Sequence, residues 1–330
     1  MSSDVSAKTK RDTRSLHYVV RSGLAGGVAG CFAKTVVAPL DRVKILFQAS
    51  NPDFQKYAGT WSGAFRAGSE IYKSSGTRGL FRGHSVTLLR IFPYAAIRYM
   101  AYDQVHDILM PTREQETNFR RFSAGSISGM ISVFFTYPLE VFRVRLAFHT
   151  KFFDHSNISL YGSFKQIYHE HADSKQSVRP GVLAPNPNLY FEKYPILKFY
   201  RGFSATMIGM IPYAGVSFLS WGFLRAHFLP PPNGLKSKPT PVADLTIGAV
   251  SGAVAQTASY PFEVIRRRMQ VGGITSPDRW LRWGETICNI WHKSGWRGFY
   301  VGLSIGYLKV VPMTAVSFTV WQSGKRLLGV

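Results

Sequence analysis

Apolar residues gather in six long stretches of the chain, and shorter, more polar segments separate them. The stretches cover residues 16–48, 81–110, 118–150, 200–228, 241–271 and 300–327. None contains a run of about 18 uncharged apolar residues of the kind that marks a transmembrane helix at once. A helix of ~30 residues is nevertheless long enough to cross a bilayer core with some tilt. The pattern therefore predicts six long helices, each able to span a membrane.

The odd-numbered stretches share one motif, which is proline, an apolar residue, an acid, two residues and a base. Its copies are "APLDRVKILFQ" (38–48), "YPLEVFRVRLA" (137–147) and "YPFEVIRRRMQ" (260–270). Glycines stand nine and thirteen residues before each proline, so every copy carries GxxxG. In lipid, GxxxG allows the backbones of two helices to approach closely.

The even-numbered stretches share a second motif. Its copies are "FRGHSVTLLRIFPYAAI" (81–97), "YRGFSATMIGMIPYAGV" (200–216) and "YVGLSIGYLKVVPMTAV" (300–316). The two motifs' prolines are 54, 74 and 51 residues apart in the three copies, so the middle copy holds an insertion at about 171–195. Short amphipathic segments lie between the motifs. The sequence therefore predicts three repeats, each with a long helix, a short surface helix and a long helix.

These repeats set the expected organisation of the chain. We expect a polar tail at 1–15, repeat 1 at 16–110, repeat 2 at 116–228 and repeat 3 at 240–328. The expected fold class is an all-α membrane protein with six transmembrane helices. Acids and bases that recur at one depth in apolar helices are costly, and by default they mark a pathway or a gate.

Composition narrows the partner but does not identify it. The formal charge of +22 points to a polyanion, which could be nucleic acid, a membrane surface or a phosphorylated metabolite. A nucleic-acid-binding helical protein would cluster its charges on one surface, whereas many here recur singly inside apolar helices. The two cysteines, Cys31 and Cys288, form no disulfide framework and no metal-site spacing. No catalytic motif stands out, so we expect neither an enzyme nor a metal or other cofactor.

The tripled Px[DE]xx[KR] motif, with the second motif after each copy, resembles the mitochondrial carrier family. The resemblance runs from about residue 18 to 328. It implies a monomeric, pseudo-threefold bundle of six helices in the inner mitochondrial membrane, with both termini towards the intermembrane space and the short helices on the matrix side. It also implies cardiolipin sites near "FRG" (81–83) and "YRG" (200–202), and Val301 replaces the base in the third copy.

The resemblance also implies two gates. In the matrix gate, the expected pairs are Asp41 with Arg143, Glu140 with Arg266, and Glu263 with Lys44. Gln48 and Gln270 occupy the position that braces these pairs, whereas the second copy has Ala147 there. The cytosolic gate is degraded to Asp103, Arg225 and Lys325. Only Asp103 is acidic, so we expect at most one ion pair there, between Asp103 and Arg225. Arg42 matches no residue in the other two copies.

The substrate is predicted from aligned residues at mid-depth. Arg90, Gly209 and Lys309 each stand three residues before a proline. Two cations and a glycine suit a ligand with phosphates at one end and a flat ring at the other. The remaining candidates for the substrate site are Lys34, Tyr94, Arg98, Met210, Tyr213 and Arg267.

The repeat sequences most resemble the coenzyme A carriers of fungi and animals, the fungal group above all. This implies transport of coenzyme A, or a related adenine 3′-phosphate compound, in exchange for an adenine nucleotide. An ADP/ATP-type carrier is the alternative, because Gly209 and Met210 also resemble the adenine contacts of nucleotide carriers. The sequence does not choose among coenzyme A, dephospho-coenzyme A and adenosine 3′,5′-diphosphate.

Overall fold

The computed structural model describes residues 16–150, 160–170, 194–228, 241–275 and 281–327. The predicted tail at 1–15 and nearly all of the predicted insertion at 171–195 lie outside these ranges. Every regular element within them is a helix. The chain divides into two compact units, a terminal unit of Met1–Val37 with Val310–Val330 and a central unit of Ala38–Lys309.

The terminal unit holds the first part of α1 (Leu16–Gln48) and all of α11 (Val310–Leu327). Small residues bring these two helices together. A Cβ atom added to Gly324 of α11 would lie 3.2 Å from the Cβ of Ala25 in α1. The glycine therefore fits a close approach between the two helices.

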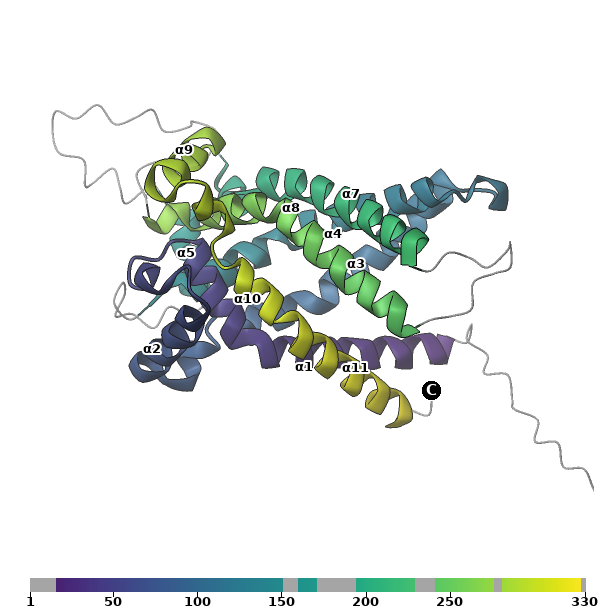
Figure 1. Cartoon of the computed structure of the whole chain (residues 1–330), viewed down its shortest axis with the longest axis horizontal. Coiled ribbons are helices and arrows are strands. Elements are labelled where there is room, and N and C mark those ends of the chain that lie inside the picture. The colour runs from purple at the N-terminus through teal and green to yellow at the C-terminus, as the bar shows by residue number, and fades with distance from the viewer. Residues whose placement is uncertain (1–15, 151–159, 171–193, 229–240, 276–280, 328–330) are drawn as a thin grey trace, which may run out of the picture. The chain divides into compact units, whose positions relative to one another are not determined.

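The central unit holds the rest of α1 and most of the other helices. They are α2 (Trp61–Leu80), α3 (His84–Leu109), α4 (Asn118–Phe148), α5 (Leu160–His169), α7 (Phe203–Phe228), α8 (Pro241–Thr275), α9 (Trp283–Ser294) and α10 (Leu303–Leu308). The 3₁₀ turns between them are η1 (Gln55–Tyr57), η2 (Arg113–Gln115), η4 (Pro195–Tyr200) and η5 (Trp296–Tyr300). The α3 helix packs along α4, and α7 packs along α8. The short helices α2, α5 and α9 gather at one end of this unit (Figure 1).

The short helix α2 shows why these elements form. Thr60 caps its N-terminus by accepting a hydrogen bond from the backbone N–H three residues later, at 3.1 Å. Ala64, Ala67 and Ile71 are buried at helical spacing, and they pack in one cluster with Leu46 of α1. An apolar stripe of this period is what fixes an amphipathic helix against its neighbour.

The last predicted helix, 300–327, differs from the expectation because it is interrupted. It divides into α10 and α11 with Lys309 between them. Pro312 is thereby the third residue of α11, in the first turn, where a missing backbone N–H leaves no hydrogen bond unmade. The five other repeated prolines stay inside continuous helices, at Pro39, Pro93, Pro138, Pro212 and Pro261.

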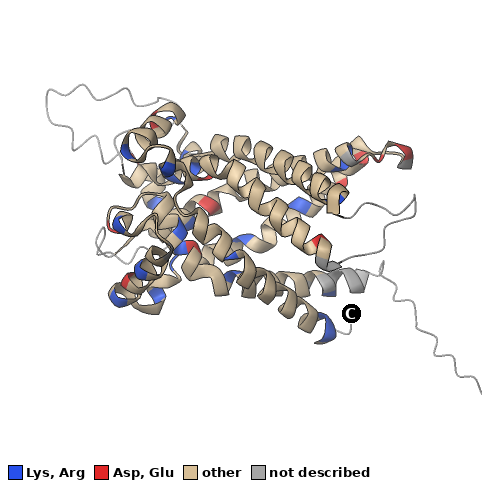
Figure 2. Cartoon of the chain, in the orientation of Figure 1, with Lys and Arg blue, Asp and Glu red and all other residues tan. Residues whose placement is uncertain are grey.

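Three segments of the described chain are long and apolar enough to cross a membrane, namely Phe119–Phe148, Pro195–Phe228 and Trp296–Leu327. Among the described residues, the other three long helices, α1, α3 and α8, do not reach this composition. Figure 2 shows that α7 is almost free of charged residues, whereas many Lys and Arg residues lie at the end of the central unit formed by α2, α5 and α9. We call this the charged end.

The first long helices of the three repeats are α1, α4 and α8, and the second long helices are α3, α7 and α10 with α11. Three glycines place the start of each second helix close to the first helix of another repeat. Gly83, Gly202 and Gly302 have φ angles of +86°, +76° and +84°, a region that glycine adopts without strain. A Cβ on Gly83 would lie 2.8 Å from the carbonyl oxygen of Arg143, and one on Gly202 would lie 3.0 Å from that of Arg266. The third residue of "FRG", "YRG" and "YVG" is thus required by both conformation and space.

Replacing Gly83 with alanine should lower the melting temperature of the purified protein. The methyl group must occupy a left-handed conformation and displace the α4 backbone, at a cost of about 2 kcal/mol or more. Gly68→Ala is the matched control, because a Cβ there meets nothing within 4 Å in the middle of α2. That change should leave the melting temperature unchanged or raise it. Equal melting temperatures for the two variants would contradict the requirement for glycine at position 83.

Candidate functional site

Three ion pairs join α1, α4 and α8 at the charged end. Arg143 Nη2 lies 2.9 Å from Asp41 Oδ2, and Lys44 Nζ lies 2.9 Å from Glu263 Oε1. Arg266 Nη2 lies 3.5 Å from Glu140 Oε1. These are the three partnerships expected from the repeats, and together they close a ring from α1 to α4, from α4 to α8 and from α8 back to α1.

Further cations bind the same carboxylates. Arg90 and Arg267 both pair with Glu140, the latter at 2.6 Å. Lys309 Nζ lies 2.7 Å from Asp41 Oδ1. The sequence assigned these three cations to the substrate, whereas the structure places each against a carboxylate of the ring.

The ring is therefore rich in positive charge. Three carboxylates contact six cations, which are Lys44, Arg90, Arg143, Arg266, Arg267 and Lys309. The Glu140 side chain is only 4% exposed, so its charge requires close partners. Formal neutrality would need three more negative charges from elsewhere.

Two tyrosines and two glutamines reinforce the ring. Gln48 donates to the Tyr260 hydroxyl at 3.0 Å, and Gln270 donates to the Tyr137 hydroxyl at 3.1 Å. Each tyrosine donates in turn to a backbone carbonyl just before a left-handed glycine, Tyr137 to residue 201 and Tyr260 to residue 301. The repeats predicted the glutamines. The tyrosines were missed, although both directly precede a repeated proline.

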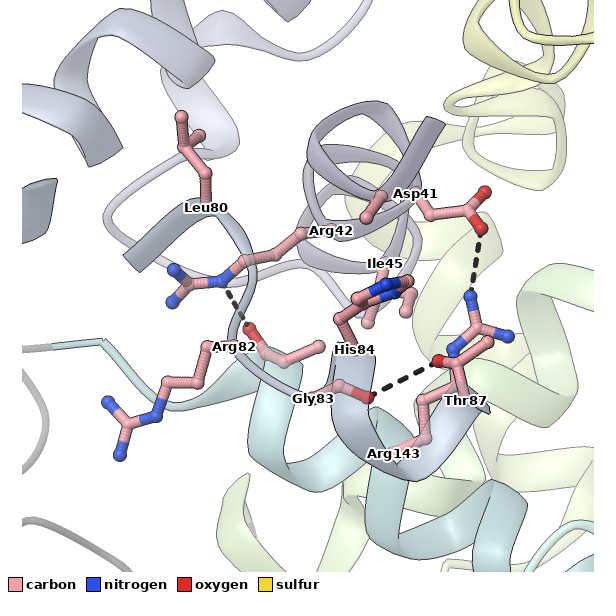
Figure 3. Close-up of a pocket in the computed structure, with 11 residues that line it drawn as sticks. Asp41, Arg42, Ile45, Leu80, Arg82, Gly83, His84, Thr87 and Arg143 are labelled. Atoms are coloured by element: carbon pink, nitrogen blue, oxygen red, sulfur yellow. Dashed lines mark hydrogen bonds and ion pairs between the residues drawn. The ribbon is translucent and has the colours of Figure 1, made fainter. Parts of the chain in front are cut away.

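We call each contact between two of the three helices of the ring a corner. The corner between α1 and α4 has neither the tyrosine nor the glutamine. Ala38 precedes the proline of α1, and Ala147 takes the glutamine position of α4. A small pocket that is partly open to solvent lies there, and both alanines line it. Figure 3 shows Asp41 and Arg143 paired on one side of this pocket, while Arg42 and Arg82 extend to the other side.

A second buried cluster lies beside the ring. Glu170 pairs with Arg145 and, at 2.9 Å, with Arg201, and Lys198 Nζ donates to the Glu170 backbone carbonyl at 2.7 Å. The cluster ties α4 to the segment that leads into α7. It was not predicted. The available signal was Arg145, whose position seven residues after the proline is again basic in the third copy, at Arg268.

Gly209 and Met210, which resemble adenine contacts in the sequence, have packing roles in this structure. A Cβ on Gly209 would lie 2.8 Å from the Cβ of Phe262, so this glycine allows α7 to approach α8. Met210 joins an apolar cluster with Val133 of α4. Tyr213 is 46% exposed.

Three candidate substrate residues remain, namely Tyr94, Arg98 and Lys34. The Tyr94 ring is 5.3 Å from the guanidinium carbon of Arg90, a cation–π distance. Arg98 is exposed one turn further along α3. Lys34 belongs to the terminal unit.

The expected cytosolic pair between Asp103 and Arg225 does not form among the described residues. Arg225 instead lies 3.6 Å from Asp244, which stands in the first turn of α8, and it packs over the Trp221 ring. Asp103 is exposed on α3. The repeats did not predict Asp244 as a partner, because it lies outside both repeated motifs.

Lys325, the third residue expected at the cytosolic gate, belongs to the terminal unit. Its Nζ lies 4.4 Å from the centre of the Trp321 ring, one helical turn earlier in α11. This is a cation–π distance. The Trp321 ring thus contacts a base of its own repeat.

The GxxxG glycines of α4 and α8 are not in close helix contact. A Cβ added to Gly125, Gly248 or Gly252 would meet nothing within 4 Å, and one on Gly129 would meet only the Met210 methyl carbon, at 3.5 Å. The expectation that GxxxG brings helix backbones together is therefore not met in this conformation. The helices approach each other at the charged end instead.

Replacing Glu140 with glutamine should destabilise the protein more than Glu263→Gln does. The first change leaves three arginines without their carboxylate, whereas the second leaves only Lys44. Loss of one member of a buried charge cluster costs about 3 to 5 kcal/mol. Melting temperatures of the two isosteric variants in one detergent provide the measurement, and the reverse order would contradict this account of the ring.

The chain matches a known protein family in each of its three repeats. The sequence profile of the family described as "Mitochondrial carrier protein" matches residues 16–113, 114–172 and 237–330. "Mitochondrial carrier protein LEU5" of Saccharomyces cerevisiae is 43% identical, over 98% of this chain and 94% of the yeast protein. "Solute carrier family 25 member 16" of Bos taurus is 38% identical, over 94% of this chain and 89% of the bovine protein. "Mitochondrial carrier protein CoAc2" of Zea mays is 37% identical, over 96% and 88%. The chain is thus a transporter with an all-α, threefold helical bundle, and it belongs to the mitochondrial carrier family.

Proposed function

We propose that this carrier moves coenzyme A, or a closely related adenine 3′-phosphate compound, across the inner mitochondrial membrane in exchange for an adenine nucleotide. It works by alternating access as a monomer. Both termini face the intermembrane space, and the charged end is the matrix gate. Cardiolipin binds near "FRG" (81–83) and "YRG" (200–202).

The observation that carries the proposal is the excess of cations in the ring. Three carboxylates contact six cations. Coenzyme A carries a pyrophosphate and a 3′-phosphate, with roughly four negative charges at neutral pH. A polyanion of this charge complements the surplus, whereas a neutral or cationic substrate would meet repulsion or find no partner.

The same contacts suggest how binding opens the gate. Arg90 lies on α3 and pairs with Glu140, and Lys309 lies between α10 and α11 and pairs with Asp41. Phosphates that bind these two cations compete with the carboxylates for them. Substrate binding therefore weakens the ring, and it favours opening to the extent that the open state binds the substrate more tightly.

The uncrowded glycines support a second conformation. Gly125, Gly248 and Gly252 have open space where a Cβ would stand. In an alternating-access cycle, the opposite ends of these helices must approach each other when the charged end separates. Small residues permit that approach.

Purified protein in liposomes should take up labelled coenzyme A when loaded with ADP or ATP. Arg90→Ala or Lys309→Ala should reduce the uptake at least tenfold, because a charge-assisted contact is worth ~1.5 to 3 kcal/mol. Arg78→Ala removes an exposed cation on α2 and should have no effect.

Competition distinguishes the substrate class. Adenosine 3′,5′-diphosphate should inhibit the uptake of coenzyme A more strongly than AMP does, because it retains the 3′-phosphate. Robust ADP/ATP exchange without any uptake of coenzyme A would instead support the ADP/ATP-type alternative.

A further inference from the structure

Two corners of the matrix gate are built in the same way. At the corner between α8 and α1, Tyr260 and Gln48 are hydrogen-bonded, and at the corner between α4 and α8, Tyr137 and Gln270 are. Tyr137 also holds the loop before α7, and Tyr260 holds the loop before α10. A buried hydroxyl with these partners fixes two helices and one loop together.

The corner between α1 and α4 lacks this device, because Ala38 and Ala147 replace the tyrosine and the glutamine. The pocket described above lies at this place. The ion pair between Asp41 and Arg143 remains. Without another contact, this corner would be held less firmly than the other two.

Arg42 supplies such a contact. Its Nε donates to the carbonyl of Ala147 at 3.1 Å, and its Nη2 donates to that of His149 at 2.9 Å. Asn51 donates to the carbonyl of Phe148, which lies between them, at 3.1 Å. These carbonyls end α4, so they have no partner within their own helix and carry the negative end of its dipole.

The second repeat has a counterpart to this contact. Arg145 Nε donates to the carbonyl of Gln270 at 3.2 Å. Ala147 and Gln270 both stand nine residues after the repeated proline, which is the brace position. Arg145 stands seven residues after its proline and Arg42 only three after Pro39, so the two arginines are about one helical turn apart in register. In the first copy the seventh position is Leu46, which packs in the core with α2.

We propose that Arg42 is a positioning residue that replaces the missing tyrosine and glutamine, and that it holds α1 against the end of α4 while the matrix gate is closed. The proposal rests on the function proposed above. One edge of a guanidinium presents two parallel donors to two carbonyls, which an ammonium group cannot do. The contact breaks when α4 moves away, so it stabilises the closed state only.

Arg42→Met should make the gate leak. In liposomes loaded with coenzyme A, efflux without an external counter-substrate should rise about tenfold relative to exchange, since loss of a charged hydrogen bond weakens the closed state by a factor of this order. The melting temperature should also fall. Arg42→Lys keeps the charge and should give an intermediate ratio. Arg78→Met, on the exposed surface of α2, should change neither measurement.

A transplanted brace provides the decisive test. Ala38→Tyr combined with Ala147→Gln, in the Arg42→Met background, recreates at this corner the pair that the other two corners contain. The combination should restore both the low efflux ratio and the melting temperature. Loss of efflux and exchange in equal proportion in Arg42→Met would mean a role in folding only, and failure of the transplant to restore the ratio would overturn the proposal.

The two proposals fail in different ways. If the wild-type protein moves no coenzyme A, the proposed function is wrong, and the melting temperatures still decide whether Arg42 replaces the brace. If the wild-type protein exchanges coenzyme A and Arg42→Met neither leaks nor melts earlier, the inference about Arg42 is wrong and the proposed function stands.

Discussion

The structure depends on three carboxylates that are held by an excess of cations. Buried charges are stable only with close partners, so Asp41, Glu140 and Glu263 determine which helices must meet and at what depth. The ring they form joins α1, α4 and α8. Because the partners come from different repeats, the ring cannot form unless all three repeats are in place.

Close packing around the ring is what makes it possible. Gly83 brings the start of α3 against the backbone of α4, and Gly202 brings the start of α7 against the backbone of α8. Tyr137 and Tyr260 tie the loops before α7 and α10 to the ring through their hydroxyls. Charge, glycine conformation and hydrogen bonding thus act at one level of the central unit.

The repeats predicted the helices well because a tripled motif supplies its own alignment. Five of the six long helices begin and end within a few residues of the expected bounds. The break at Lys309 was missed, because the third copy looks the same as the others in sequence. The three expected ion pairs are present because acid and base recur at fixed spacing, and this spacing places them at one depth.

The partner of each cation was harder to predict than its position along the helix. Depth does not say whether a long side chain such as that of Arg90 reaches a substrate or a carboxylate. The partners of Arg42 could not be predicted either, because they are backbone carbonyls, which any residue offers.

The surplus of cations has an electrical consequence. In the proposed exchange, three unbalanced positive charges would offset most of the charge of an anionic substrate while it is bound. These cations stay with the protein and return to their starting side in each cycle, so a membrane potential acts only on the difference in charge between the two exchanged substrates, with ~2.3 kcal/mol per elementary charge and 100 mV. The direction of net transport would then depend on the energised state of the mitochondrion only where the two substrates differ in charge.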